Sequence, residues 1–189
     1  MKIGIYGGSF NPVHFGHVGL AKWVIENTDL DELWMLVSPN NPLKPAGILA
    51  PEEERLAGVR EAIKDIPHVK ASDFEFHLPR PSYTANTLRE LQKNYPKYEF
   101  TLVIGEDNIA IFDQWREYEY ILENFRIFVY PRTSSRQTGG VASAEKGTDI
   151  RWNKNIAVFQ AKPVKEIRYL SEAPTFDISS TAIRRSQGR

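Results

Sequence analysis

The chain has 189 residues, 41% of them hydrophobic, and its 24 basic and 24 acidic side chains cancel to a formal net charge of zero. That length suits one globular domain, and the lack of a basic excess argues against a dedicated nucleic-acid-binding protein. Zero cysteines exclude a disulfide framework and cysteine chemistry, while no signal peptide and no run of ~20 apolar residues is visible, so we expect a cytoplasmic small-molecule enzyme without a membrane partner.

Apolar runs typical of strands alternate with helical patterns along most of the chain. The predicted strands are residues 2–6, 32–38, 69–72, 100–105, 126–130, 156–160 and 166–170, and the predicted helices are 15–27, 51–64, 83–95, 118–124 and 179–185. This alternation predicts one α/β domain over residues 1–189, with a Rossmann-like, doubly wound, mostly parallel sheet and helices on both faces. Ligands of such sheets bind beyond the carboxyl ends of the strands.

The first motif is the run GGSFNPVHFGH at residues 7–17, which joins the first predicted strand to the first helix. Its glycines permit a tight turn, and the following helix start presents N–H groups and partial positive charge that suit a phosphate. His14 and His17 are three residues apart and share one helical face. Alternatively, the two histidines could be half of a metal site, but the chain has only two further histidines, His68 and His77, that could complete it. The glycine spacing does not fit a dinucleotide-binding fingerprint.

The loop SPNNPLKP at residues 38–45 follows the second predicted strand. Its prolines limit the shapes that the loop can take, and Asn40 and Asn41 offer both donors and acceptors. Lys44 would place a point charge over a phosphate. Taken alone, the segment is also explained as a generic turn.

The run PSYTANTLREL at residues 81–91 predicts a helix start with Ser82 as N-cap and Thr84 at its exposed end. A capped amphipathic helix would explain this run without any function. Farther on, Gly105 ends a strand and permits close backbone approach, and Asp107 could accept from ribose hydroxyls. Trp115 follows, and a tryptophan is more often core than a ligand platform.

The run DISSTAIRR at residues 177–185 predicts a second capped helix start. Its first-turn N–H groups and Arg184 could hold phosphates from the side opposite His17. A capped terminal helix with exposed arginines remains the simpler alternative. The run TSSRQTGG near residues 133–140 is poor in apolar residues, and residues 132–149 are predicted to form a mobile surface loop.

These segments, in this order, resemble the HxGH, PNNPxK, SYTxxTL, GxD and ISSTxxR motifs of the nicotinate-nucleotide adenylyltransferases, a branch of the nucleotidylyltransferase superfamily. The resemblance implies AMP transfer from ATP to nicotinate mononucleotide, giving deamido-NAD and pyrophosphate in NAD biosynthesis. It implies direct in-line attack without a covalent intermediate. The alternatives are a nicotinamide-mononucleotide or phosphopantetheine adenylyltransferase of the same fold, and a silent nucleotide-binding sensor.

The resemblance also implies residue roles. The catalytic residues would be His14, His17 and Arg184. The ATP-binding residues would be Gly8, Ser9, Phe10, His14, His17, Gly105, Asp107, Ile178, Ser179, Ser180 and Arg184. Nicotinate mononucleotide would contact Ser9, Asn40, Asn41, Lys44, Tyr83, Thr84 and Trp115, with Trp115 stacked on the ring. Mg²⁺ would be carried on ATP with no protein metal site, and no nucleic-acid partner is expected, while a homo-oligomer is left open.

Overall fold

The computed structural model describes residues 1–39, 49–132, 163–176, 178 and 180–186. Its strands are β1 (Lys2–Gly8), β2 (Glu32–Val37), β3 (Val69–Ser72), β4 (Glu99–Gly105), β5 (Arg126–Tyr130) and β6 (Glu166–Tyr169). Its helices are α1 (Phe15–Asn27), α2 (Glu52–Ile63), η1 (Phe74–His77), α3 (Thr84–Asn94), α4 (Glu106–Ile109), η2 (Phe112–Gln114), α5 (Tyr118–Asn124) and α7 (Ser180–Ser186). None of the described helices is long and apolar enough to cross a membrane.

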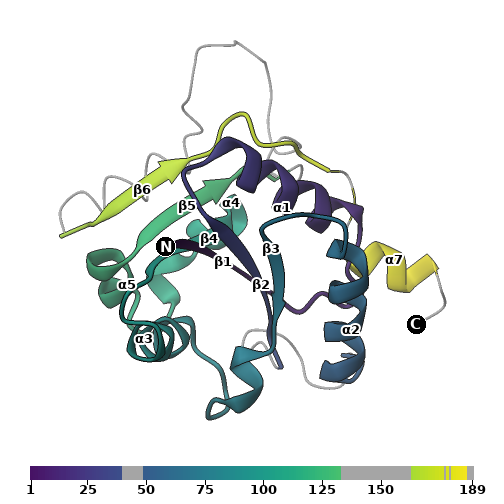
Figure 1. The fold of residues 1–189 in the computed structure, drawn as a ribbon, viewed down its shortest axis with the longest axis horizontal. Helices are drawn as coiled ribbons and strands as arrows, with labels where there is room; N and C mark the ends of the chain where they lie inside the picture. The colour runs from purple at the N-terminus through teal and green to yellow at the C-terminus, as the bar shows by residue number, and fades with distance from the viewer. Residues whose placement is uncertain (40–48, 133–162, 177, 179, 187–189) are drawn as a thin grey trace.

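The six described strands form one sheet in the order β3-β2-β1-β4-β5-β6, and every neighbouring pair is parallel. The chain runs outward from β1 to β3, returns to the centre at β4, and then runs to the other edge (Figure 1). This reversal leaves a switch point between β1 and β4, and their carboxyl ends are where such sheets bind ligands. The predicted doubly wound parallel sheet is confirmed.

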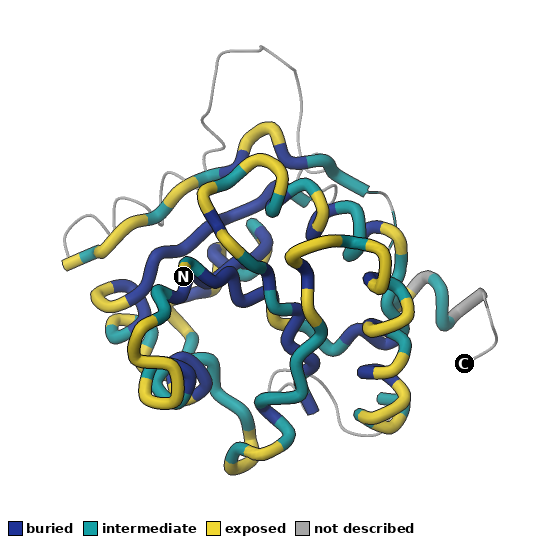
Figure 2. The backbone as a smooth tube through the Cα atoms, viewed as in Figure 1, coloured by how far each residue is buried: buried dark blue, intermediate teal, exposed yellow. Residues whose placement is uncertain are grey.

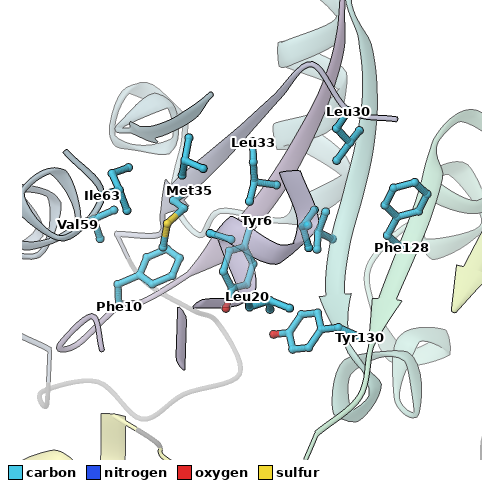
Figure 3. Packing of buried hydrophobic residues seen from close by; sticks show 14 of the residues in the cluster. Tyr6, Phe10, Leu20, Leu30, Leu33, Met35, Val59, Ile63, Phe128 and Tyr130 are labelled. Carbon is cyan, nitrogen blue, oxygen red and sulfur yellow. The ribbon is translucent and has the colours of Figure 1, made fainter. Parts of the chain in front are cut away.

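Helices cover both faces of this sheet because successive strand residues point to opposite sides. On one face, α1 and α2 pack over Tyr6, Leu33, Met35 and Phe128. On the other, α3 and α5 pack over Ile5, Leu36, Leu102 and Ile127. Figure 2 shows the buried residues gathered along the central strands, and Figure 3 shows part of the first layer, with Tyr6 between Met35 and Tyr130. The continuous apolar runs of the strands reflect burial on both sides.

The predicted elements agree closely with the structure. Residues 69–72, 126–130, 15–27 and 118–124 form elements with the predicted bounds, and the other described elements differ by at most two residues at an end. The short elements η1, α4 and η2 were not predicted, because three or four residues carry too little periodicity to recognise. The predicted strand 156–160, and the predicted loop beyond Arg132, lie outside the described residues.

Candidate functional site

A cavity of about 790 Å³ opens at the carboxyl ends of β1 and β4, at the switch point of the sheet. Its size is typical of a small-molecule site. Twelve of the predicted site residues line it: Gly8, Ser9, Phe10, His14, His17, Tyr83, Thr84, Gly105, Asp107, Trp115, Ser180 and Arg184. Asn40, Asn41, Lys44 and Ser179 lie outside the described residues. Segments that are distant in the sequence therefore meet in one space.

The turn after β1 is held by the side chain of Phe10. Its backbone is left-handed, with φ of 43°, and its ring is 3% exposed. The ring makes edge contacts with Tyr6 and His17, with centroids 5.6 and 5.0 Å away. A Cβ at Gly8 would stand 2.9 Å from this ring, so Gly8 makes room for it. The Phe10 ring thus belongs to the core as well as to the cavity wall, and it supports the ring of His17.

His14 and His17 share the first turn of α1 and both line the cavity. The backbone N–H of His14 donates to Nδ1 of His17 over 3.3 Å. Because Nδ1 accepts this bond, neutral His17 carries its proton on Nε2, where it can donate to a ligand. Burial, and secondarily the charge of Arg132, lower the pKa of His14.

The start of α7 lies directly against the turn after β1. The Ser180 hydroxyl donates to the carbonyl of Pro12 over 2.9 Å, and the Arg184 guanidinium donates to the carbonyl of Asn11. The side chain of Ile178 packs toward α1, since a Cβ at Gly16 would lie 3.0 Å from its Cγ2. Ile178 was predicted to bind ATP, but its side chain contacts α1 and is not part of the cavity lining.

The end of β4 brings a carboxylate and a guanidinium together at the cavity. Nε of Arg132 lies 3.2 Å from Oδ1 of Asp107. A Cβ at Gly105 would contact Asp107 and would stand 2.9 Å from Nε of Arg132, so a larger residue here would displace this pair of charged groups. The sequence analysis placed Arg132 in a surface loop and did not identify it as a site residue. The arginine nevertheless comes just after β5, a strand whose carboxyl end points toward the site.

The opposite end of the cavity is lined by aromatic residues. Trp115 packs against Phe112 with ring centroids 5.0 Å apart, and the guanidinium of Arg116 lies 4.9 Å from the Tyr83 ring centroid. The indole Nε1 of Trp115 and the Ser82 hydroxyl are shielded from solvent and have no hydrogen-bond partner within the structure. Buried polar atoms of this kind cost free energy unless a ligand or water satisfies them.

Basic side chains slightly outnumber acidic ones at this cavity, although the net charge of the chain is zero. Among the described lining residues there are three arginines, Arg116, Arg132 and Arg184, and two acidic residues, Asp107 and Glu75. Sequence reasoning missed Arg116 and Glu75 as well. Among the described residues, no group of three or more histidine, aspartate or glutamate side chains could hold a metal ion. Such a cavity suits a ligand that is rich in phosphate.

These features define a nucleotide-binding α/β protein, with paired imidazoles at the switch point of a parallel sheet. The model of the cytidylyltransferase-like family matches residues 5–186. A protein of Bacteroides thetaiotaomicron named "probable nicotinate-nucleotide adenylyltransferase" is 44% identical over 186 residues, which cover 98% of this chain and 81% of that protein. One of the same name from Flavobacterium psychrophilum is 50% identical over 135 residues, 71% of this chain and 70% of that protein.

The fold is shared with a solved structure of nicotinic acid mononucleotide adenylyltransferase from Plasmodium falciparum in complex with NaAD. Its TM-score is 0.72 at 18% identity, with 97% of this chain and 82% of that chain covered. The chain belongs to the cytidylyltransferase-like family and, within it, to the nicotinate-nucleotide adenylyltransferases.

Proposed function

We propose that this chain transfers AMP from ATP to nicotinate mononucleotide, giving deamido-NAD and pyrophosphate in NAD biosynthesis. The observation that carries the proposal is a single cavity that joins the imidazole pair of α1 to the aromatic end around Trp115. A transfer between two nucleotides requires a phosphate-binding turn and an acceptor pocket within one continuous space. The family to which the chain belongs points to the same reaction.

The chemistry requires alignment and charge neutralisation more than proton transfer. A phosphate oxygen of the mononucleotide attacks the α-phosphorus of ATP, and the bond from that phosphorus to the bridging oxygen breaks as pyrophosphate leaves. Because a phosphate monoester is already an anionic nucleophile, no general base or covalent intermediate is needed. The rate enhancement then comes from holding the reactants in line and stabilising charge on the leaving group.

The residues of the turn and of α7 supply that stabilisation. His17 donates from Nε2 to the α-phosphate oxygens, and His14 contacts the triphosphate beside it. Arg184 and Ser180 hold the β- and γ-phosphates, and Ser179 and Ile178 are proposed to contribute to the same ATP site. Arg184 already donates to Asn11, and its guanidinium has five N–H groups, so donors remain for phosphate. The backbone of Gly8, Ser9 and Phe10 follows the phosphates.

The acceptor and the adenosine are proposed to contact the remaining walls of the cavity. Trp115 stacks on the pyridine ring, with Tyr83 and Thr84 at its side, and Ser9 contacts the acceptor from the turn after β1. Asn40, Asn41 and Lys44 contact the mononucleotide from the loop after β2. Gly105 lets the adenosine ribose approach Asp107.

Mg²⁺ enters this reaction as part of the substrate, on the triphosphate. Among the described residues that line the cavity, the acidic side chains are already engaged, since Asp107 pairs with Arg132 and Glu75 accepts from Thr87. The ion therefore keeps phosphate oxygens and water as its ligands, and it neutralises charge on the pyrophosphate group.

The direct test measures pyrophosphate release from Mg-ATP with nicotinate mononucleotide, nicotinamide mononucleotide and phosphopantetheine supplied separately. We expect strong preference for nicotinate mononucleotide, with deamido-NAD as the second product. Equal or better turnover of nicotinamide mononucleotide would keep the class of reaction and refute the choice of acceptor. No turnover with any of the three, together with measurable ATP binding, would indicate a nucleotide sensor.

A further inference from the structure

Glu75 is a buried carboxyl in the wall of the cavity. It belongs to η1, between β3 and α3, and 5% of its surface is exposed. Its Oε1 accepts a hydrogen bond from the Thr87 hydroxyl over 2.8 Å. Among the described residues no hydrogen bond of ordinary geometry reaches its Oε2, which is shielded from solvent. Thr87 therefore anchors one oxygen, while the other lies in the cavity wall, where the Ser38 side chain is the second protein group that acts on this carboxyl.

The surroundings of Glu75 favour its neutral, protonated form. Burial raises the pKa of this carboxyl, against the opposing effect of hydrogen bonds from Thr87 and Ser38. Among the described residues, no lysine or arginine forms an ion pair with it. In the neutral form the anchored oxygen accepts from Thr87, and Oε2 carries a hydrogen that it can donate.

This donor lies at the end of the cavity proposed for the pyridine ring. Thr87 is one helical turn beyond Thr84, and its hydroxyl also lies 3.3 Å from the carbonyl of Tyr83. Next to Tyr83, the Ser82 hydroxyl is a second donor with no hydrogen-bond partner among the described residues. A ligand that satisfied both donors at once would present an anionic acceptor such as a carboxylate.

We propose that Glu75 donates a hydrogen bond through Oε2 to the carboxylate of nicotinate mononucleotide and thereby selects this acceptor over its amide analogue. The proposal rests on the proposed function and names the residue that sets its specificity. A carboxylate offers two acceptor oxygens, whereas an amide offers one and turns its NH₂ group toward donors. Each donor that the amide leaves unpaired penalises the wrong acceptor.

The test compares kcat and KM for the two mononucleotides at saturating Mg-ATP in wild type, Glu75→Gln and Glu75→Met. Glutamine can still accept from Thr87 and donate from its amide nitrogen. In Glu75→Gln the ratio of kcat/KM for nicotinate mononucleotide to kcat/KM for the amide analogue should therefore stay within about threefold of wild type. Methionine fills similar space without a donor. Because a hydrogen bond to a charged group contributes about 1.5–3 kcal/mol, KM for nicotinate mononucleotide should rise about tenfold or more, with a smaller change for the amide.

Thr87→Val is the matched control, since it removes the anchoring bond but not the proposed donor, and we expect the acceptor ratio to change less than in Glu75→Met. The proposal is overturned if Glu75→Met weakens the binding of both acceptors equally, or if Glu75→Gln loses the preference as fully as Glu75→Met.

If Glu75→Met does not fold, Glu75→Asp is used instead, because its shorter side chain withdraws the donor. An unchanged acceptor ratio in Glu75→Asp overturns the proposal. Calorimetric binding of each mononucleotide gives the same comparison without turnover. Wild type that makes no deamido-NAD would refute the proposed function instead.

Discussion

The imidazole rings of His14 and His17 stack with centroids 3.6 Å apart and planes inclined by 23°. Two protonated rings at this distance would repel each other, and burial together with Arg132 already lowers the pKa of His14. His14 is therefore neutral in the free enzyme at neutral pH. We expect bound triphosphate to oppose this shift, because nearby negative charge favours the protonated imidazole.

His17→Ala should lower kcat by about 10²–10³-fold, the usual cost of removing one donor aimed at a developing charge. Binding of ATP should weaken less, because the donor acts most strongly in the transition state. Steady-state kinetics of deamido-NAD formation measure the effect, and circular dichroism checks that the fold is intact. Turnover within a few-fold of wild type would remove His17 from the mechanism.

Gly19→Ala should destabilise the fold, because the ring of Phe176 lies where the new methyl group would go. An added Cβ would stand 2.5 Å from Cζ of Phe176, so this ring, in the segment that leads into α7, would have to shift. Overpacking of this kind costs about 1–3 kcal/mol, and it should also raise KM for ATP because Ser180 and Arg184 follow that segment. Urea unfolding measures the first effect and steady-state kinetics the second.

Gly58→Ala is the matched control for this substitution. Gly58 is also inside a helix, α2, but a Cβ there would meet Cγ1 of Val13 at an ordinary 3.7 Å. We expect it to be neutral or to stabilise the protein by up to about 1 kcal/mol, because alanine is the better helix former. Equal destabilisation by both variants would contradict the packing role of Gly19.

The fold could be predicted from the sequence because apolar strand-like runs alternate with helical patterns. Arg126–Tyr130 is buried at every residue, and such a run is easy to recognise between helices, whereas Val69–Ser72 is largely only partly buried and is marked mainly by its place between two helical patterns. The order of the strands in the sheet could not be predicted in the same way, since pairing depends on contacts between segments far apart in the chain. The switch point between β1 and β4 emerges only from that order.

The site was predicted where its chemistry is carried by motifs and missed where it depends on packing. Phe10 lines the cavity, but no pattern indicates that its left-handed backbone also packs the ring against the core. Glu75 stands between Phe74 and Phe76, and strand-like alternation would expose it, but the 3₁₀ turn buries it instead. A detectable signal was overlooked at Arg55, which shares one face of its helix with Val59 and Ile63.

Arg55→Met should destabilise the protein and weaken substrate binding. The Arg55 guanidinium is buried and donates to the carbonyls of Ser9, Ser38, Pro39 and Ala50 at 2.6–3.2 Å. It thereby ties the turn after β1 to the end of β2 and to Ala50, two residues before α2. Removing the donors leaves several carbonyls unsatisfied, at about 1–3 kcal/mol for each one that stays buried. We expect a lower urea midpoint and a higher KM for the acceptor.

Arg60→Met is the control on the same helix. Its side chain is largely exposed, and its nearest carboxylate, that of Asp73, lies 3.7 Å away. An exposed pair at that distance contributes little, so the free energy of unfolding should change by less than about 0.5 kcal/mol. A similar loss in both variants would mean that the carbonyl contacts of Arg55 are not what stabilises this region.

Asp29→Asn should lower stability at neutral pH but not in acid. The guanidinium of Arg126 donates to both carboxylate oxygens of Asp29, at 2.9 and 3.2 Å, and Lys2 adds a third bond at 2.7 Å. These partners, Arg126 first, hold the pKa of Asp29 well below its ordinary value. Because the pKa is depressed in the folded state, the stabilisation is complete above the unfolded pKa of about 3.9 and is lost as the pH falls toward the folded pKa.

The free energy of unfolding should fall by about 1 kcal/mol in Asp29→Asn at pH 7, a modest amount because Asp29 is partly exposed and solvent screens the pair. This difference from wild type should shrink steadily below about pH 4. Urea unfolding of wild type and Asp29→Asn at pH 7, 5 and 3 measures the difference. Glu123→Gln, at an exposed position of α5, controls for the general effect of removing a negative charge and should show no such trend. A difference between wild type and Asp29→Asn that stayed constant from pH 7 to pH 3 would show that the ion pair with Arg126 does not stabilise the fold.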